Sequence, residues 1–188
     1  MKASDVINSV INAGAAPVLK AGGFRKSNWN FHRRKGSIVQ VVNFQRGYEN
    51  RGDDGIFYVN IGIAFDELWQ LQGLELTGYA RKVMERPLEH QCHFRSRLEN
   101  LVLDCPRWWV VAGNQSSAQF FREVSSVSGR EIITSDAETD RVAKYLAISI
   151  ERAVTELEKI DGPKSFLSHP WKNTPGNGAV SKYLSSLT

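Results

Sequence analysis

Residues 56–65 alternate between large apolar side chains and smaller or polar ones, and this alternation restricts the fold more than any other feature of the sequence. Successive side chains of a strand point to opposite faces of a sheet, so a period of two predicts a strand with one face on a core and one facing outward. The apolar positions are Phe57, Val59, Ile61, Ile63 and Phe65, and the outward positions are Tyr58, Asn60, Gly62 and Ala64.

Further strands are expected on both sides of this segment. Trp29 and Phe31 alternate with polar residues, and Lys35-Gly36 offers a tight turn into the β-branched segment 37–45. This order predicts a hairpin. Residues 92–98 alternate again, which predicts a fourth strand, and the short apolar run 108–111 is a fifth strand or a core anchor.

Two helices frame these strands. The first is expected from Ser4 to Ala21, because Gly22-Gly23 is a typical stop after a helix. The second is expected over residues 136–160, where apolar residues recur at helical spacing. Shorter helices are expected over residues 66–73 and 116–124. The stripe of the long helix consists of Val142, Tyr145, Leu146, Ser149, Ala153, Leu157 and Ile160.

These elements predict an α+β fold, with a mostly antiparallel sheet of four or five strands packed by an N-terminal helix and a long C-terminal helix. A chain of 188 residues buries roughly 70% of its surface in one domain. We assign residues 1–161 to that domain. Residues 162–188 are rich in Gly, Pro and Ser, and we expect a loosely ordered tail that Phe166 and Trp171 anchor.

The composition of the chain indicates the cellular compartment in which we expect the protein. No run of about 18 apolar residues exists, and the first residues lack a charged segment followed by an apolar one, so we expect neither a membrane span nor secretion. Two cysteines, Cys92 and Cys105, are too few for a disulfide framework. The cytoplasm is therefore the expected compartment.

The chain carries a set of short motifs: Gly23-Phe24-Arg25-Lys26, Trp29-Asn30-Phe31, the segments 40–45 and 57–63, the Cys-His-Phe-Arg-Ser-Arg-Leu segment 92–98, and Trp108-Trp109. In their order and spacing these motifs resemble a bacterial family, the domain-of-unknown-function family numbered 4304. The resemblance covers roughly residues 15–112 and implies an α+β domain of bacterial origin with no established activity. The chain after Asp161 matches nothing in that family.

The outer face of the sheet is the first candidate site. In a simple meander, polar side chains of the strands project from one side, with Arg34, Tyr58 and Glu99 among them. Such a face suits a carboxylate, a phosphate or an acidic protein surface, because arginine presents a planar fork to these anions. A polar face that merely lies in water is the alternative. The residues expected to contact a ligand are His32, Asn43, Gln45, Asn60, His93, Arg95 and Arg97.

The distribution of charge gives a second hypothesis. The chain carries a formal net charge of +4, but residues 20–51 hold eight Lys or Arg and one acid, whereas residues 131–161 hold eight acids and four bases. This asymmetry predicts an electric dipole across the domain. The basic region 25–51, with its aromatic residues, would suit single-stranded nucleic acid. A solvated basic edge that discourages strand pairing is the alternative.

Catalysis gives a third hypothesis, a hydrolase or nuclease with His93 or His32 as acid or base. Cys92 falls on the predicted apolar face, where a cysteine acts as a small buried hydrophobe. On a strand, Cys92 and His93 point to opposite faces, so with His90 they cannot share a zinc ion unless a bulge interrupts the strand. We therefore assign no catalytic residue, metal or cofactor. The favoured prediction is a non-enzymatic binding or adaptor module for an unknown protein or anionic ligand.

Overall fold

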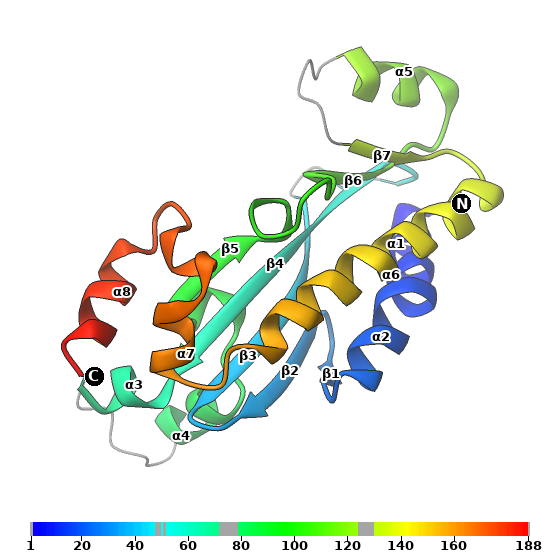
Figure 1. Cartoon of the computed structure of the whole chain (residues 1–188). Coiled ribbons are helices and arrows are strands. Elements are labelled where there is room, and N and C mark those ends of the chain that lie inside the picture. The colour runs from blue at the N-terminus through cyan, green and yellow to red at the C-terminus, as the bar shows by residue number, and fades with distance from the viewer. Residues whose placement is uncertain (1, 48–49, 51, 72–78, 124–129, 188) are drawn as a thin grey trace.

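The computed structural model describes residues 2–47, 50, 52–71, 79–123 and 130–187. Its centre is a mixed sheet in the order β1-β2-β3-β4-β6-β7, in which β5 also pairs with β4 (Figure 1). All pairs are antiparallel except β6 with β7. The strands are β1 (Arg25–Ser27), β2 (Asn30–Lys35), β3 (Ile38–Arg46), β4 (Gly55–Phe65), β5 (Phe94–Arg97), β6 (Trp108–Val111) and β7 (Arg130–Ile133).

The α+β class is confirmed, but the expected sheet of four or five mostly antiparallel strands was too small and missed its parallel pair. Strands β1 and β7 have three and four residues, too few to display a period of two. Helix α5 (Gln115–Glu123) lies between β6 and β7 in the chain. A crossover of this kind allows two consecutive strands to run parallel.

Strand β4 is the longest strand and organises the sheet. Along one edge it pairs with β3 over nine residues. Its other edge is divided, since residues 60–63 pair with β5 and residues 55–57 pair with β6. The large apolar residues expected on one face of this strand are all buried in the main core.

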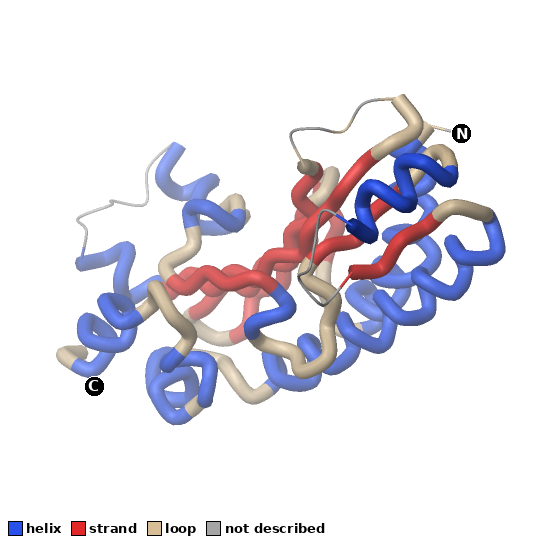
Figure 2. The backbone as a smooth tube through the Cα atoms, turned by 90° about the horizontal axis from the view of Figure 1, so that it is seen from above, coloured by secondary structure: helices blue, strands red, loops and turns tan. Residues whose placement is uncertain are grey.

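One face of the sheet is covered by the N-terminal helical segment and by the long helix α6 (Figures 1 and 2). The first consists of α1 (Ala3–Val10), a π-helical turn η1 (Ile11–Ala15) and α2 (Ala16–Ala21), and α6 spans Asp136–Glu158. Both expected long helices are confirmed. The remaining helices are α3 (Asp66–Leu71), α4 (Tyr79–Glu85), η2 (Glu89–Gln91), η3 (Leu98–Asn100), α7 (Pro163–Ser168), η4 (Pro170–Asn173) and α8 (Gly178–Ser185).

The C-terminal segment is folded against the sheet, so the expectation of a loosely ordered tail was wrong. Phe166, Trp171 and Leu184 are buried in the main core, which confirms the first two as anchors. The ring of Phe166 lies 5.2 Å from those of both Phe65 and Phe94. Glycine and proline separate three short helical elements here, and the apolar residues between them provide the burial that holds the segment in place.

The second face of the sheet is only partly open. A smaller apolar cluster covers one end of it, between the sheet and the segment from α3 to η2. Cys92 belongs to this cluster, not to the apolar face that carries Phe94, because strand β5 begins only at Phe94 and the alternation does not reach back to Cys92. The cluster consists of Val39, Val41, Ala64, Trp69, Met84 and Cys92.

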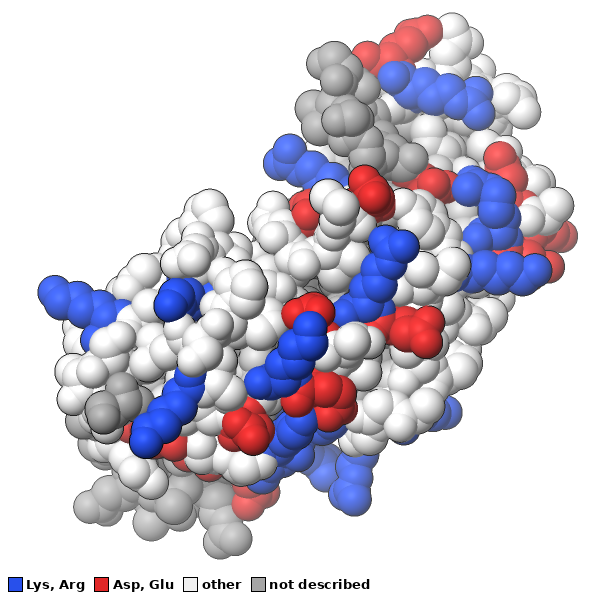
Figure 3. Space-filling model, in the orientation of Figure 1, with Lys and Arg blue, Asp and Glu red and all other residues white. Residues whose placement is uncertain are grey.

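Ion pairs join the basic segment to the acidic one, so their charges partly balance where the two segments meet. Arg33 and Lys35 of β2 both pair with Glu158 at the end of α6. Figure 3 shows acidic and basic side chains next to one another on the α6 side. Within the described residues, no helix combines the length and apolar character that crossing a membrane requires.

Candidate functional site

The open part of the second face carries a row of polar residues. Asn30, Asn43, Asn60 and Arg97 are successive Cα partners across β2, β3, β4 and β5. Because directly opposite residues share a face, their side chains lie side by side. The expected meander of these strands is confirmed, and with it the common face of Asn43, Asn60 and Arg97.

The amides of this row are linked by hydrogen bonds. Asn43 Nδ2 donates to Asn30 Oδ1 at 3.0 Å. Asn60 Nδ2 donates to Asn43 Oδ1 at 3.0 Å and to Gln45 Oε1 at 3.1 Å. These bonds fix the orientation of each amide. They use the oxygen of Gln45 and leave its exposed Nε2 group as a donor toward solvent.

Arg97 is held by an aromatic ring. Its guanidinium carbon lies 4.0 Å from the centroid of the Tyr58 ring, which meets Trp108 edge-on at 6.5 Å. No acceptor among the described residues takes a hydrogen bond from this half-buried guanidinium. Burial raises the pKa of nearby Glu99, and the charges of Arg97 and Arg107 oppose that rise. Arg97 is therefore fixed by stacking while its donors stay available.

Arg95 is anchored on two sides. Its Nε lies 3.1 Å from Oε1 of Glu89. The buried side chain of Asn177 accepts from Arg95 N–H at 3.0 Å and donates to its carbonyl at 2.9 Å. Asn177 thereby occupies the free edge of β5 as a neighbouring strand would.

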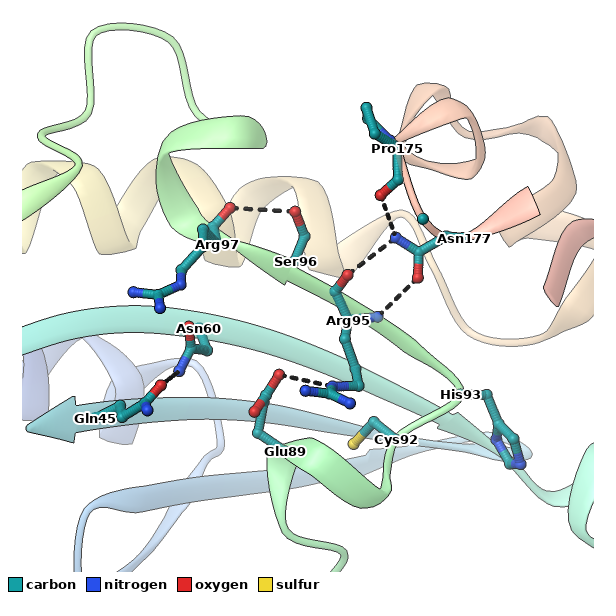
Figure 4. Close-up of a pocket in the computed structure, with 11 residues that line it drawn as sticks. Gln45, Asn60, Glu89, Cys92, His93, Arg95, Ser96, Arg97, Pro175 and Asn177 are labelled. Carbon is teal, nitrogen blue, oxygen red and sulfur yellow. Dashed lines mark hydrogen bonds and ion pairs between the residues drawn. The ribbon is translucent and has the colours of Figure 1, made fainter. Parts of the chain in front are cut away.

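These groups line a cavity of about 480 Å³, which we call the sheet pocket. Figure 4 shows Arg95 and Arg97 extending from β5 over β4, with Asn177 approaching from the C-terminal segment. The lining residues are Gln45, Asn60, Glu89, Cys92, His93, Arg95, Ser96, Arg97, Pro175, Gly176 and Asn177.

His93 lies at the edge of the sheet pocket and points away from the guanidinium groups (Figure 4). Its Nδ1 accepts the backbone N–H of Phe65 at 3.0 Å, so its hydrogen is on Nε2. Burial lowers the pKa of His93 to about 4. The ring is neutral at pH 7, and its Nε2 is buried without a partner among the described residues.

Five of the seven predicted contact residues line the sheet pocket. Asn43 supports it through Asn60, and His32 lies elsewhere, with its Nε2 2.8 Å from the carbonyl of Pro87. The prediction that His32 joins this site was wrong, because the segment after α4 covers that part of the face. Sequence reasoning missed Glu89 and Asn177, and the Pro-Gly-Asn-Gly sequence around Asn177 indicates only a turn.

The chemistry of the remaining candidates is limited by burial. Burial and the charge of Glu89 raise the pKa of the Cys92 thiol far above its ordinary value, so this thiol stays protonated at pH 7. Among the described residues, no group of three or more His, Cys, Asp or Glu is placed to hold a metal ion.

Comparison with known proteins gives one match. A family model described as a domain of unknown function, DUF4304, matches residues 15–135. This span includes the whole sheet and excludes the C-terminal segment that supplies Asn177. No curated protein and no solved structure matches the chain.

Proposed function

The chain belongs to the DUF4304 family of domains of unknown function, and we propose that it is a non-enzymatic binding module whose sheet pocket takes carboxylate groups of an acidic partner protein. The stacked guanidinium of Arg97 carries this proposal. A guanidinium that is already oriented, and whose donors lack acceptors, binds a carboxylate with little further loss of side-chain entropy.

The surroundings of Arg97 favour a protein partner. The Tyr58 ring, 4.0 Å from the guanidinium carbon of Arg97, lies with it on the open face of the sheet. Half-buried Trp108 adds a second aromatic group beside Tyr58. Tyrosine, tryptophan and arginine are the residues that most often dominate binding energy in protein interfaces. The positive charge of the guanidinium groups selects an acidic segment as the occupant.

Two observations favour binding over acid–base catalysis at this pocket. The only hydrogen bond of His93 among the described residues is to a backbone N–H, and a general acid or base needs a partner that can exchange a proton. The Cys92 thiol is buried and protonated, which disfavours a nucleophilic role. We place the module in the bacterial cytoplasm, as expected from the family resemblance and the free cysteines.

The test uses fluorescein-labelled hexaglutamate and fluorescence anisotropy at low ionic strength. We expect the wild-type chain to bind and Arg97→Gln to lose about tenfold in affinity, since a hydrogen bond to a charged group contributes about 1.5 kcal/mol or more. Arg97→Lys keeps the charge without the fork and should lie between them. Lys144→Gln, an equal charge change on the exposed side of α6, should bind like wild type. Equal affinities of wild type and folded Arg97→Gln, or no binding by wild type, would overturn the proposal.

A further inference from the structure

A second cavity of about 530 Å³ lies at the edge of β2, where β1 ends and the end of α4 approaches. It shares no lining residue with the sheet pocket. We call it the basic pocket, because one acidic and five basic side chains line it. These are Glu85, Arg25, Lys26, Arg33, Arg34 and Arg86.

Three of the five cations are already engaged. Arg33 pairs with Glu158, Arg34 pairs with Asp66 at 2.6 Å, and Lys26 donates to Asn12 at 2.7 Å. The side chains of Arg25 and Arg86 make no hydrogen bond or ion pair with any described residue. They come from β1 and from the residue after α4, so folding brings together two guanidinium groups that have no ion-pair partner among the described residues. This arrangement favours an anion.

His32 adds a second requirement to the basic pocket, namely a ligand that can donate a hydrogen bond. Its side chain is nine-tenths buried and lines the basic pocket. Because Nε2 faces the carbonyl of Pro87, Nε2 carries the hydrogen and Nδ1 is an acceptor. Nδ1 has no partner among the described residues. A buried acceptor of this kind is costly unless a donor reaches it.

We propose that the basic pocket binds hydrogen phosphate, whose P–OH group donates to His32 Nδ1 while its charged oxygens accept from Arg25 and Arg86. Hydrogen phosphate combines negative charge with a hydrogen-bond donor at neutral pH. Sulfate and carboxylates are fully ionised there and have no donor. A phosphodiester also lacks a P–OH group, so the same argument disfavours a nucleic-acid backbone as the occupant.

Acidity should weaken this selectivity. Burial lowers the pKa of His32, and the charge of Arg86 lowers it further, whereas the hydrogen bond to Pro87 raises it. The other charged groups that line the pocket are Arg25, Lys26, Arg33, Arg34 and Glu85. Once His32 is protonated, Nδ1 becomes a donor, and sulfate then satisfies it as well as phosphate does.

The test is isothermal titration calorimetry of the full chain with inorganic phosphate and with sulfate at equal ionic strength. We expect phosphate to bind at least tenfold more tightly than sulfate at pH 7.5, and the ratio to fall at pH 5.5. Phenyl phosphate is the second probe. At pH 7.5 it is a dianion and, unlike hydrogen phosphate, has no P–OH group. If it binds more tightly than inorganic phosphate at pH 6.0, the phosphate assignment stands and the source is a monoester.

Variants locate the site. Arg86→Gln removes an exposed side chain without partners and should lower phosphate affinity about tenfold, and Arg25→Gln should act in the same direction. His32→Phe should bring the ratio of phosphate to sulfate affinity close to one. If that variant does not fold, the Arg86 variant and the sulfate comparison still decide the question.

Two controls separate this site from other basic surfaces. Lys144→Gln in α6 and Lys164→Gln in α7 are exposed changes and should both keep wild-type phosphate affinity. The two pockets share no lining residue, so failure of the sheet-pocket proposal leaves this one intact. Equal binding of phosphate and sulfate at pH 7.5 would overturn the proposal, as would an Arg86→Gln variant with unchanged affinity. Tighter binding of a thymidine hexanucleotide than of phosphate would also overturn it, in favour of a nucleic-acid surface.

Discussion

The buried side chain of Gln40 joins the guanidinium of Arg33 to the end of helix α6. Its Oε1 accepts from Nε and Nη2 of Arg33 at 2.9 and 2.6 Å. Its Nε2 donates to the carbonyls of Leu157 and Ile160, both at 2.8 Å. The last carbonyls of a helix have no partner within the helix. One side chain thus satisfies a buried cation and a helix end together.

Replacement of Gln40 by leucine should therefore destabilise the fold strongly. Gln40→Leu keeps a similar volume but leaves Nε and Nη2 of Arg33 and the Ile160 carbonyl without a partner, whereas the Leu157 carbonyl keeps the Ile160 N–H. Each unpaired buried group costs about 1–3 kcal/mol. We expect the free energy of unfolding in urea to fall by about 3–5 kcal/mol. Gln70→Leu, on the exposed side of α3, should change it by no more than about 0.5 kcal/mol. Equal urea midpoints for Gln40→Leu and wild type would contradict this reading.

The sequence predicted the part of the site that forms where strands close in sequence pair with one another. The turn at Gly36, with φ of +57°, sets the register of β2 and β3. That register places Asn30 opposite Asn43 and, through the next strand, beside Asn60. Because the side-chain period of a strand is two, knowing the hairpin and the alternation is enough to assign these residues to one face.

The rest of the site depends on contacts between distant segments. Asn177 meets Arg95 across 82 residues of sequence, and no local pattern encodes that meeting. The position of His32 in its strand places it on the polar face, as expected, but the segment after α4 covers it. Cys92 lies two residues before Phe94, so a continuous strand would place both on one face. A turn between them breaks the alternation, and they lie on different faces. Periodicity predicts orientation within one strand and says nothing of what later packs on that strand.

Gly14 should be irreplaceable for a reason unrelated to helix propensity. A Cβ there would lie 2.3 Å from the carbonyl oxygen of Ala143 in α6. Helix propensity favours alanine by about 1 kcal/mol, but the backbone of α6 cannot rotate away as a side chain can, and overpacking costs about 1–3 kcal/mol or more. We expect Gly14→Ala to lower the thermal midpoint.

The matched control for this change is Gly178→Ala. A Cβ at Gly178, in the first turn of α8, meets nothing within 4 Å. We expect this variant to be as stable as wild type or more stable by up to about 1 kcal/mol, as measured by thermal unfolding followed by circular dichroism. A Gly14→Ala variant that gained stability to the same degree would show that η1 and α6 do not pack as closely as described.

Asn177 should control the stability of the C-terminal helices. Asn177→Ala removes both bonds to Arg95 and should cost about 2 kcal/mol locally. Asn177→Asp keeps the acceptor but places an oxygen against the Arg95 carbonyl, so it should not rescue the loss. Hydrogen exchange followed by mass spectrometry should show faster exchange in β5 and α8 in both variants. Asn173→Ala, an exposed change in η4, should leave the rate unchanged, and unchanged exchange in the Asn177 variants would refute the anchoring role.

His93 should make the folded state sensitive to mild acid. Burial lowers the pKa of His93 in the folded protein to about 4 from its usual 6.5. The unfolded chain therefore binds a proton at this side chain at higher pH than the folded chain does. Stability is fully present above pH 6.5 and is lost as the pH falls toward 4. The pKa of His32 is lowered too, so it acts in the same direction.

The variant His93→Asn isolates this contribution, because the amide oxygen can still accept the Phe65 N–H and does not titrate. His32 is common to both proteins and cancels in the comparison. Between pH 7 and pH 5, wild type should lose about 2 kcal/mol more unfolding free energy than the variant, since one unit of pKa corresponds to about 1.4 kcal/mol. Urea unfolding at pH 7, 6 and 5 measures the difference. Parallel losses in the two proteins would mean that His93 is protonated as readily in the folded chain as in the unfolded one.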